Sequence, residues 1–433
     1  MFSDFRLFCF MNVVPVWLLG AWLMSMPASL SAQTSEVLEM QDGTEIPYTH
    51  YAASGGRLFI WIAPEAGLLA AEQKAAYDLS SAGNEVWYPD LFAANFLPVV
   101  TSSVEHFPSE QISALLNAAT GTGKQVYFVT SGRGVIPVLR GLRDWQQQHP
   151  DSTAMRGLIL FSPKFFVATP DPGQVGEIMP IVEATNLPVF IVQPKKSPWY
   201  WKLDRTLPAL RRGGSEVFVR PFANVRDRFY YRPDATRYEQ ALAQHVPTMI
   251  RQAANLLAYL PSQRQVAQAI QRQAPEVQSS KKERTLTPLE GMPIPPALGL
   301  KDLQGRLHSL QDYRGEVVMV NFWASWCPPC VYEMPSMQRL KEQLKGKPFR
   351  ILAVNMAEDV PTIQEFLNEK VSVDFSILLD SDGAALKRWG VFAFPTTYFI
   401  DKQGRLRYGL FGGREWDKPD VLSMLKTLID ELP

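Results

Sequence analysis

This sequence is poor in cysteine and histidine, and it carries no excess of either charge. Its 433 residues include only three cysteines and five histidines. A structural zinc site usually takes two pairs of Cys or His ligands. No cysteine follows Cys330, and the only histidine near it is His308, so the Cys327–Cys330 pair lacks the second half of such a site. The sequence therefore argues against a metal, and we expect no other cofactor.

The charge is balanced, with 43 Lys and Arg residues against 43 Asp and Glu residues. A zero net charge gives no electrostatic reason to expect a nucleic-acid partner. The length of 433 residues favours two or more domains, and a hydrophobic content of 46% is enough to fill their cores.

Residues 1–32 are typical of a targeting segment. Positions 5–30 are nearly all apolar, and small residues precede Gln33, as signal-peptide cleavage requires. The apolar length is also near that of a spanning helix, so an uncleaved anchor is the alternative. Both interpretations export the rest of the chain. We expect a periplasmic protein, soluble after cleavage or tethered to the inner membrane, with Cys327 and Cys330 as its only cysteines after cleavage.

The sequence around the two cysteines predicts a strand followed by a helix. Residues 317–320 are apolar, mostly β-branched, and lead into Phe322 and Trp323, which favours a strand buried on both faces. Apolar positions after Cys330 recur at helical spacing. The start of a helix offers unpaired N–H groups and a positive potential, which stabilise a thiolate at Cys327. A thiol pair at such a junction indicates redox chemistry.

Three segments resemble the TlpA/ResA type of thioredoxin-fold (redoxin) thiol–disulfide oxidoreductase. They are NFWASWCPPC with the EMP that follows, the lead-in at residues 307–315, and residues 391–401, which resemble the segment carrying the cis-proline of that fold. The resemblance covers residues 292–433 and implies a redox-active disulfide between Cys327 and Cys330. It also implies a reductase of protein disulfides that draws electrons from a membrane thiol transporter.

The resemblance assigns roles within this domain. Cys327 is expected to attack a substrate disulfide and Cys330, more buried, to resolve the mixed disulfide. Thioredoxins have a buried Asp where Asn321 stands here, so Glu333 is the carboxylate left for acid–base help. The remaining expected site residues contact or shape the substrate: Pro395, cis and facing the thiols, Phe394, whose backbone pairs with an extended substrate strand, Trp326 and Thr396.

A thiol peroxidase is the first competing function. The Pro and Thr that usually precede a peroxidatic cysteine are missing, since Val320 and Ala324 stand at those spacings. The second competing function is that of a bifunctional protein with a residual hydrolase activity in the domain that precedes the redox domain.

Residues 33–262 alternate strand and helix signals, which is typical of a parallel α/β sheet. The order resembles an α/β-hydrolase domain, whose nucleophile follows a strand in a tight turn. The chain reads VTSGRG there, with Gly132 at the nucleophile position and Ser131 beside it. Lys195 and Lys196 stand where the acid is expected, and no histidine follows the strand at residues 217–219, the nearest being His245. Because a Ser–His–Asp relay needs all three groups in contact, we expect a non-catalytic domain.

Residues 195–237 carry eleven Lys and Arg against four Asp and Glu, with aromatic clusters among them. This region is either a solvated rim over core aromatics or a docking surface for an acidic partner. Residues 263–291 contain Gln-rich, Ser/Lys and Pro-rich runs, which predict an extended linker between the two domains.

Overall fold

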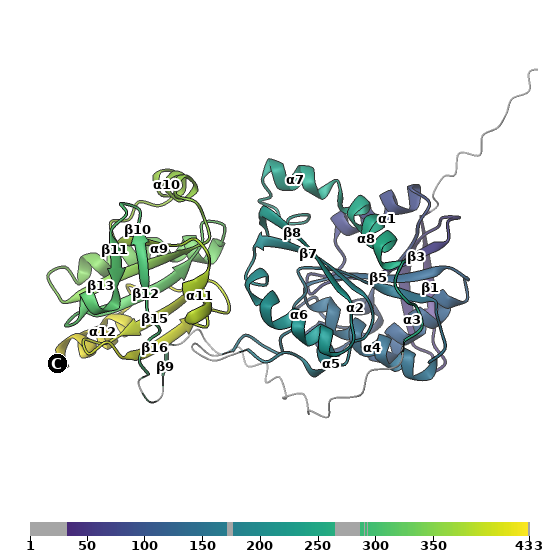
Figure 1. Ribbon diagram of the computed structural model, residues 1–433, viewed down its shortest axis with the longest axis horizontal. Helices are drawn as coiled ribbons and strands as arrows, with labels where there is room; N and C mark the ends of the chain where they lie inside the picture. The colour runs from purple at the N-terminus through teal and green to yellow at the C-terminus, as the bar shows by residue number, and fades with distance from the viewer. Residues whose placement is uncertain (1–32, 171–175, 265–285, 290, 292, 432–433) are drawn as a thin grey trace, which may run out of the picture. The chain divides into compact units, whose positions relative to one another are not determined.

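The computed structural model describes residues 33–170, 176–264, 286–289, 291 and 293–431. The targeting segment predicted for residues 1–32 and most of the linker predicted for residues 263–291 lie outside these residues. The described chain is an α/β protein with two eight-stranded mixed sheets (Figure 1). None of the helices described is both long and apolar enough to cross a bilayer.

The N-terminal sheet has the strand order β1-β2-β4-β3-β5-β6-β7-β8. Its strands are β1 (Gln33–Glu39), β2 (Glu45–Tyr51), β3 (Arg57–Ile62), β4 (Glu85–Pro89), β5 (Gln125–Ser131), β6 (Met155–Phe161), β7 (Val189–Lys196) and β8 (Val217–Arg226). The pairs β1–β2 and β2–β4 are antiparallel and the others are parallel. The prediction of a parallel sheet is thus wrong at this edge. Residues 40–44 alone connect β1 to β2, too few for the crossover that parallel strands need.

Helices cover both faces of this sheet (Figure 1). They are α1 (Ala70–Ser81), α2 (Leu91–Ala94), α3 (Ser109–Thr120), α4 (Val135–Gln148), α5 (Pro180–Glu183), α6 (Leu203–Arg212), α7 (Arg237–Ala243) and α8 (Val246–Leu257), with 3₁₀ turns η1 (Ser103–His106), η2 (Gly132–Gly134) and η3 (Tyr200–Lys202). α1 packs with α8 on one face, and α3 packs with α4 on the other. The apolar strands between these helices form one continuous buried core.

The single long helix predicted over residues 238–260 is two helices. α7 ends at Ala243, and α8 begins at Val246 with Pro247 in its first turn. Proline lacks the N–H that a continuing helix would use and is tolerated only near a helix start, which explains the break. His245 lies exposed at this break, at the N-cap of α8.

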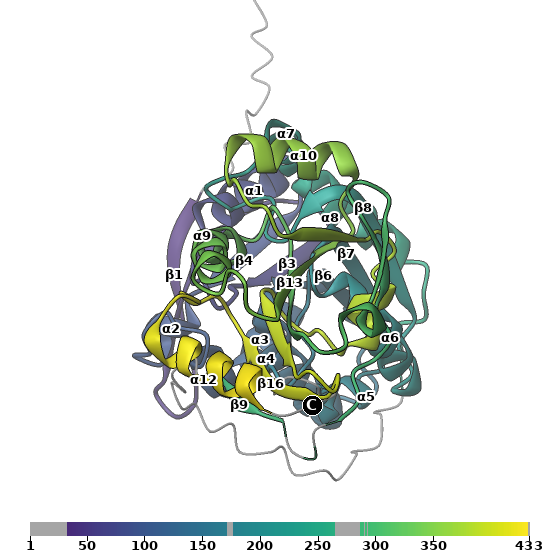
Figure 2. The same cartoon turned by 90° about the vertical axis from the view of Figure 1, so that its left-hand side faces the viewer.

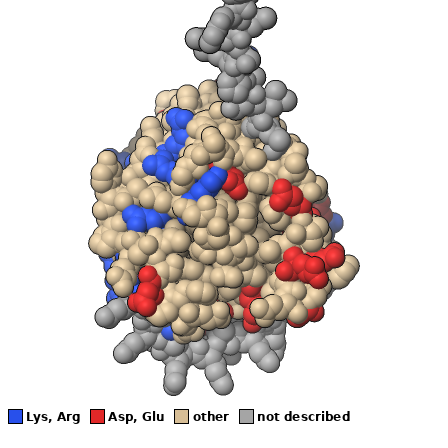
Figure 3. Space-filling view, turned by 90° about the vertical axis from the view of Figure 1, so that its right-hand side faces the viewer, with Lys and Arg blue, Asp and Glu red and all other residues tan. Residues whose placement is uncertain are grey.

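One face of the N-terminal domain is drawn in Figure 3, where charged side chains of both signs lie in small groups among uncharged ones. Neither sign covers this face. That distribution agrees with the balanced composition of 43 basic and 43 acidic residues.

The C-terminal sheet has the order β11-β10-β14-β13-β12-β15-β16-β9. Its elements are β9 (Thr287–Pro288), β10 (Gly299–Asp302), β11 (Leu307–Ser309), η4 (Leu310–Tyr313), β12 (Val317–Trp323), α9 (Pro328–Gln343), β13 (Phe349–Met356), α10 (Val360–Glu369), β14 (Ser376–Asp380), α11 (Ala384–Arg388), β15 (Thr396–Ile400), β16 (Leu406–Phe411) and α12 (Pro419–Asp430). β12, β13 and β14 run parallel, and β15 is antiparallel to β12. β9 pairs with β16, so this sheet begins within the range predicted as linker.

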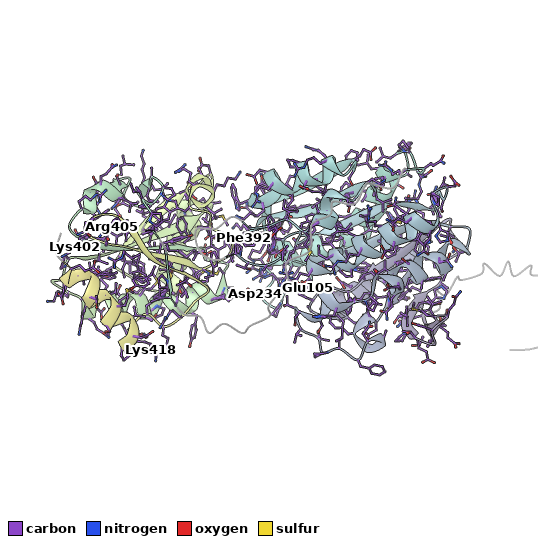
Figure 4. The ribbon with its side chains drawn as sticks, turned by 90° about the horizontal axis from the view of Figure 1, so that it is seen from below. Glu105, Asp234, Phe392, Lys402, Arg405 and Lys418 are labelled. Carbon is purple, nitrogen blue, oxygen red and sulfur yellow. A yellow bond between two sulfur atoms is a disulfide. The ribbon has the colours of Figure 1, made fainter. Side chains whose placement is uncertain are left out.

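β12 is buried along its whole length, because helices lie on both faces of this sheet. α9 and α12 pack on one face (Figure 2), and α11 packs on the other. The turn between β15 and β16 carries Lys402 and Arg405, and Lys418 precedes α12 (Figure 4). Arg405 Nε donates to Asp401 Oδ2 at 2.8 Å across that turn, which ties the hairpin together.

Candidate active site

The two cysteines lie where β12 passes into α9. Cys327 is the N-cap of α9, with Pro328 and Pro329 in the first turn, where the missing N–H groups have no helical partner to lose. Cys327 and Cys330 are joined in a disulfide with Cα atoms 5.3 Å apart. Cys327 is 5% exposed and Cys330 is fully buried. Both cysteines of the disulfide are therefore more enclosed than an exposed nucleophile would be, and Cys327 is the more accessible of the two.

Glu333 is fully buried, one turn after Cys330 on α9. Its Oε1 accepts a hydrogen bond from Asn321 Nδ2 at 2.7 Å, and its Oε2 accepts from Trp416 Nε1 at 2.9 Å. Burial raises the pKa of the Glu333 carboxyl to about 8, although these donors and the backbone N–H of Arg414 favour the charged form. The group can thus hold or release a proton near neutral pH.

Asn321 connects this carboxyl to the neighbouring strand. It lies on β12 opposite Thr397 of β15, and its Nδ2 also donates to Thr397 Oγ1 at 2.9 Å. Its Oδ1 is buried and has no hydrogen-bond partner among the described residues. Asn321 therefore supplies donors to its neighbours, as an amide does, and no proton acceptor of the carboxylate kind.

Phe394 and Pro395 lie in the loop before β15, and Trp326 directly precedes Cys327. The Phe394–Pro395 peptide bond is cis. The half-buried rings of Trp326 and Phe394 meet edge to face, with centroids 5.8 Å apart. The side chain of Thr396, predicted to bind substrate, is instead fully buried, and its hydroxyl donates to the Ala393 carbonyl at 2.6 Å. Thr396 therefore shapes the loop and presents no side chain to a substrate.

A second carboxylate, missed by the sequence reasoning, holds the loop that leads to Cys327. Glu358 accepts bonds from the backbone N–H of Ser325 at 2.7 Å and from the Ser325 hydroxyl at 2.5 Å. Asn355 Nδ2 donates to the same carboxylate at 2.9 Å, and Glu358 is only 4% exposed. No local motif marks Glu358, which is 33 residues from Ser325.

In the N-terminal domain, the turn after β5, where the resemblance predicts a nucleophile, has a glycine with positive φ. Gly132 has φ +56°, and a Cβ built there would lie 2.4 Å from Glu65 Oε2. The Glu65 carboxylate accepts from the Arg133 backbone N–H at 2.9 Å, from Lys164 Nζ, and from Arg228 Nη2 at 3.4 Å. Burial alone would raise the pKa of Glu65, but Lys164 and these hydrogen bonds lower it to about 2. A fixed internal carboxylate thus fills the space that a side chain at position 132 would need.

Ser131, the alternative nucleophile, is 4% exposed, and its hydroxyl has no hydrogen-bond partner in the described chain. It lines a cavity of about 10 Å³, which has room for one water molecule. Nearby, the fully buried Glu72 accepts from Tyr88 Oη at 2.6 Å and from Tyr230 Oη at 2.9 Å. Burial raises the pKa of Glu72 to about 7.

At the two positions where the resemblance predicts an acid and a histidine, the structure has a lysine and, after β8, an aspartate followed by an arginine. β7 runs on to Lys196, where an acid was sought. β8 runs on to Arg226, beyond the predicted end at residue 219, and Asp227 and Arg228 follow it. His245 is the exposed N-cap of α8, and neither Ser131 Oγ nor Asp227 Oδ1 has a hydrogen-bond partner among the described residues, so no relay connects them to a histidine.

Comparisons with known proteins bear on the C-terminal domain. Residues 293–409 match the AhpC/TSA family. The chain is 38% identical over 133 residues to the thiol-disulfide oxidoreductase ResA of Geobacillus thermodenitrificans, covering 31% of this chain and 75% of that protein.

Two solved structures are similar to the same part of the chain. One is a DsbE-type thiol:disulfide interchange protein of Chlorobium tepidum, with 30% identity, 32% of this chain and 96% of that chain covered, and a TM-score of 0.30. The other is described as a secreted thiol-disulfide isomerase of Corynebacterium glutamicum, with 25% identity, 35% and 96% coverage, and a TM-score of 0.31. The N-terminal domain stays unidentified. The Cys327–Cys330 pair and the 38% identity over 75% of a curated relative show that the chain, through its C-terminal domain, belongs to the ResA-type thiol–disulfide oxidoreductases.

Proposed function

We propose that the protein is an exported reductase of protein disulfides in which Cys327 attacks the substrate and Cys330 resolves. The observation that carries this proposal is the disulfide at the first turn of α9, with Cys327 at the N-cap and Cys330 buried behind it. The positive end of a helix stabilises a thiolate at its N-cap, and the more accessible sulfur meets the substrate first.

The reaction balances as a two-electron exchange. In the reduced enzyme the Cys327 thiolate attacks one sulfur of the substrate disulfide, and the other substrate sulfur leaves as a thiolate. The Cys330 thiolate then attacks Cys327 Sγ in the mixed disulfide and releases the second substrate sulfur. The substrate gains two electrons and two protons, and the enzyme ends in the disulfide form that the structure has.

We propose that the Glu333 carboxylate accepts the proton of the Cys330 thiol. The carboxyl lies one turn along α9 from Cys330, is sealed from solvent, and has its pKa raised to about 8 by burial. A buried acid that titrates near neutral pH accepts a proton from a thiol more readily than an ordinary carboxylate does. Asn321 holds its Oε1 and leaves Glu333 as the acid–base group.

We further propose export and an external electron source. The apolar residues 5–30 of this chain are typical of an exported protein. Each turnover leaves the enzyme oxidised, so a donor must return two electrons. A membrane thiol transporter is the donor that the proposal requires.

Trapping tests this proposal. Cys330→Ala in cells should accumulate proteins disulfide-linked to Cys327, because the resolving thiol is gone, while Cys327→Ala should accumulate none. In vitro, the reduced full chain should reduce insulin disulfides and consume no peroxide. Peroxide consumption without insulin reduction would favour the thiol peroxidase instead.

For the N-terminal domain, within the proposed limits 33–262, we propose a non-catalytic role in recruiting or orienting substrate. Glu65 fills the space over Gly132, and among the described residues no histidine or other group hydrogen-bonds to the Ser131 hydroxyl. A folded domain tethered to the redox domain through the proposed linker at residues 263–291 would raise the local concentration of a bound partner near Cys327. A residual hydrolase activity would have to work through Ser131.

Much of the positive charge of the basic region at residues 195–237 is neutralised within the domain, which leaves fewer basic side chains for an acidic docking partner. Several of its arginines pair with acids of the same domain: Arg212 with Glu183, Arg226 with Asp234 and Glu239, Arg228 with Glu65, and Arg232 with Asp234. Phe229 and Tyr230 are buried in the N-terminal core. We keep an acidic partner as a proposal for the basic residues outside these pairs.

A further inference from the structure

We propose that Trp416 is a positioning residue for disulfide exchange, which controls proton transfer at Glu333 through its indole N–H. The inference rests on the proposed role of Glu333. It extends that role to a residue 83 positions away, in the segment between β16 and α12.

Three contacts fix the Trp416 indole beside Glu333. The side chain is fully buried, and its Nε1 donates to Glu333 Oε2 at 2.9 Å. Its backbone N–H donates to Ser336 Oγ at 2.9 Å, and that hydroxyl donates to the Glu333 carbonyl at 2.7 Å. The ring packs against Phe399 of β15, with centroids 5.6 Å apart. The indole therefore has one orientation, and that orientation aims its N–H at the carboxyl.

The segment that carries Trp416 also contacts the other parts of the site. The Gly412 N–H donates to the Pro395 carbonyl at 2.8 Å. A Cβ at Gly413 would lie 2.7 Å from the Pro329 carbonyl oxygen, so only glycine fits against the first turn of α9. The Arg414 N–H reaches Glu333 Oε2 at 3.4 Å. One short segment thus spans the cis-proline loop, the CxxC turn and the buried carboxyl.

The physical consequence is a balance between burial and donors. Burial raises the pKa of Glu333, whereas the hydrogen bonds from Asn321 and Trp416 and the weaker one from Arg414 stabilise the charged carboxylate. The indole N–H is a donor only and cannot accept a proton, so it favours the ionised form alone. Removing this N–H leaves the buried carboxylate with one hydrogen-bond donor fewer. The neutral acid is then favoured, and the pKa of Glu333 rises.

The variant Trp416→Phe tests this, because it keeps a buried ring and removes the N–H. The matched control is Trp389→Phe, a buried tryptophan of the same domain whose Nε1 has no hydrogen-bond partner among the described residues. The measurement is the pH dependence of the rate at which the reduced full chain reduces a small aromatic disulfide, with Glu333→Gln identifying the inflection that belongs to Glu333.

We expect Trp416→Phe to move that inflection up by about one pH unit, which lowers the rate at pH 7 by up to about tenfold. Trp389→Phe should leave the inflection in place. An unmoved inflection in Trp416→Phe, with the inflection lost in Glu333→Gln, overturns the inference and leaves the proposed function standing. An inflection that survives Glu333→Gln instead removes Glu333 from the mechanism.

A second measurement does not depend on the folding of Trp416→Phe. In the unaltered protein, the indole ¹⁵N–¹H resonance of one tryptophan should titrate with the same midpoint as the Glu333 inflection. That titration should vanish in Glu333→Gln. Indole resonances that are all insensitive to the ionisation of Glu333 would also overturn the inference.

Discussion

The two sheets present the same kind of junction, a buried strand passing into a helix, and use it in opposite ways. After β12, Cys327 takes the N-cap of α9, and the disulfide with Cys330 lies in the first turn. After β5, Gly132 turns the chain with positive φ, and the carboxylate of Glu65 closes the space above it. The first junction therefore carries a reactive sulfur and is a redox site. The second is filled by an internal ion pair and is closed.

Each junction also has a fully buried glutamate nearby, and the comparison shows what a buried acid needs in order to act. Glu333 lies one turn from a thiol, and burial raises its pKa to about 8. Glu72 has its pKa raised to about 7 by burial and is held by Tyr88 and Tyr230. A shifted pKa is therefore insufficient for assigning chemistry, because the nucleophile candidate near Glu72 is the hydroxyl of Ser131 and not a thiol.

The largest expected effect contrasts the two nucleophile candidates. Cys327→Ser should lower the rate of insulin-disulfide reduction to the uncatalysed rate, since a serine hydroxyl cannot attack a disulfide sulfur as a thiolate does. Ser131→Ala should leave insulin reduction unchanged, and a screen of ester substrates should show no turnover by the unaltered chain. Ester turnover that Ser131→Ala abolishes would contradict the view of a sealed N-terminal site.

The next effect concerns the two buried glutamates. Glu333→Gln should slow disulfide exchange by roughly a hundredfold at neutral pH and remove an inflection near pH 8, because the amide cannot accept a proton. Glu72→Gln, the matched change in the other domain, should leave both the rate and the inflection unchanged. Equal effects of the two substitutions would mean that Glu333 acts through stability alone.

A smaller effect tests whether Glu65 closes the turn after β5. Gly132→Ala should lower the free energy of unfolding by about 2–4 kcal/mol, from the positive φ and the contact with Glu65. Gly43→Ala is the control, because Gly43 has φ +83° and no atom within 4 Å of a built Cβ. It should cost only about 1–2 kcal/mol. Denaturant unfolding followed by tryptophan fluorescence measures both, and equal costs would remove Glu65 as the cause.

The smallest effect is expected from removing residues 33–262. Reduction of a small generic disulfide should stay nearly unchanged, since the described contacts of Glu333, Asn321 and Trp416 all lie in the C-terminal domain. Reaction with a partner identified by trapping on Cys327 should weaken, because the tether raises local concentration. If the native partner reacts equally fast with the truncated chain, the recruiting role is lost.

Local patterns predicted the parts of the site that are close in sequence. The apolar run and the helical spacing around Cys327 and Cys330 correspond to β12 and α9, and the Phe394–Pro395 bond is cis as the resemblance implied. The β1–β2 hairpin was missed because β1 is largely exposed and neither strand carries an apolar run.

The missed contributors to the site are all distant in sequence from the groups they contact. Trp416 meets Glu333 across 83 residues, and Glu358 meets Ser325 across 33. Glu65 likewise reaches the turn at Gly132 only through the fold. A tryptophan or a glutamate has no sequence signal for such a role, because the same residue types are common in cores and on helix surfaces.

The most direct test of the redox assignment is alkylation of the fully reduced chain by iodoacetamide across a pH series, with the modified cysteine identified by mass spectrometry. Cys327 at the N-cap of α9 should be alkylated well before the buried Cys330. Its rate should reach half its maximum at a lower pH than that of N-acetylcysteine measured in parallel. Faster alkylation of Cys330 would contradict the assignment of Cys327 as the attacking thiol.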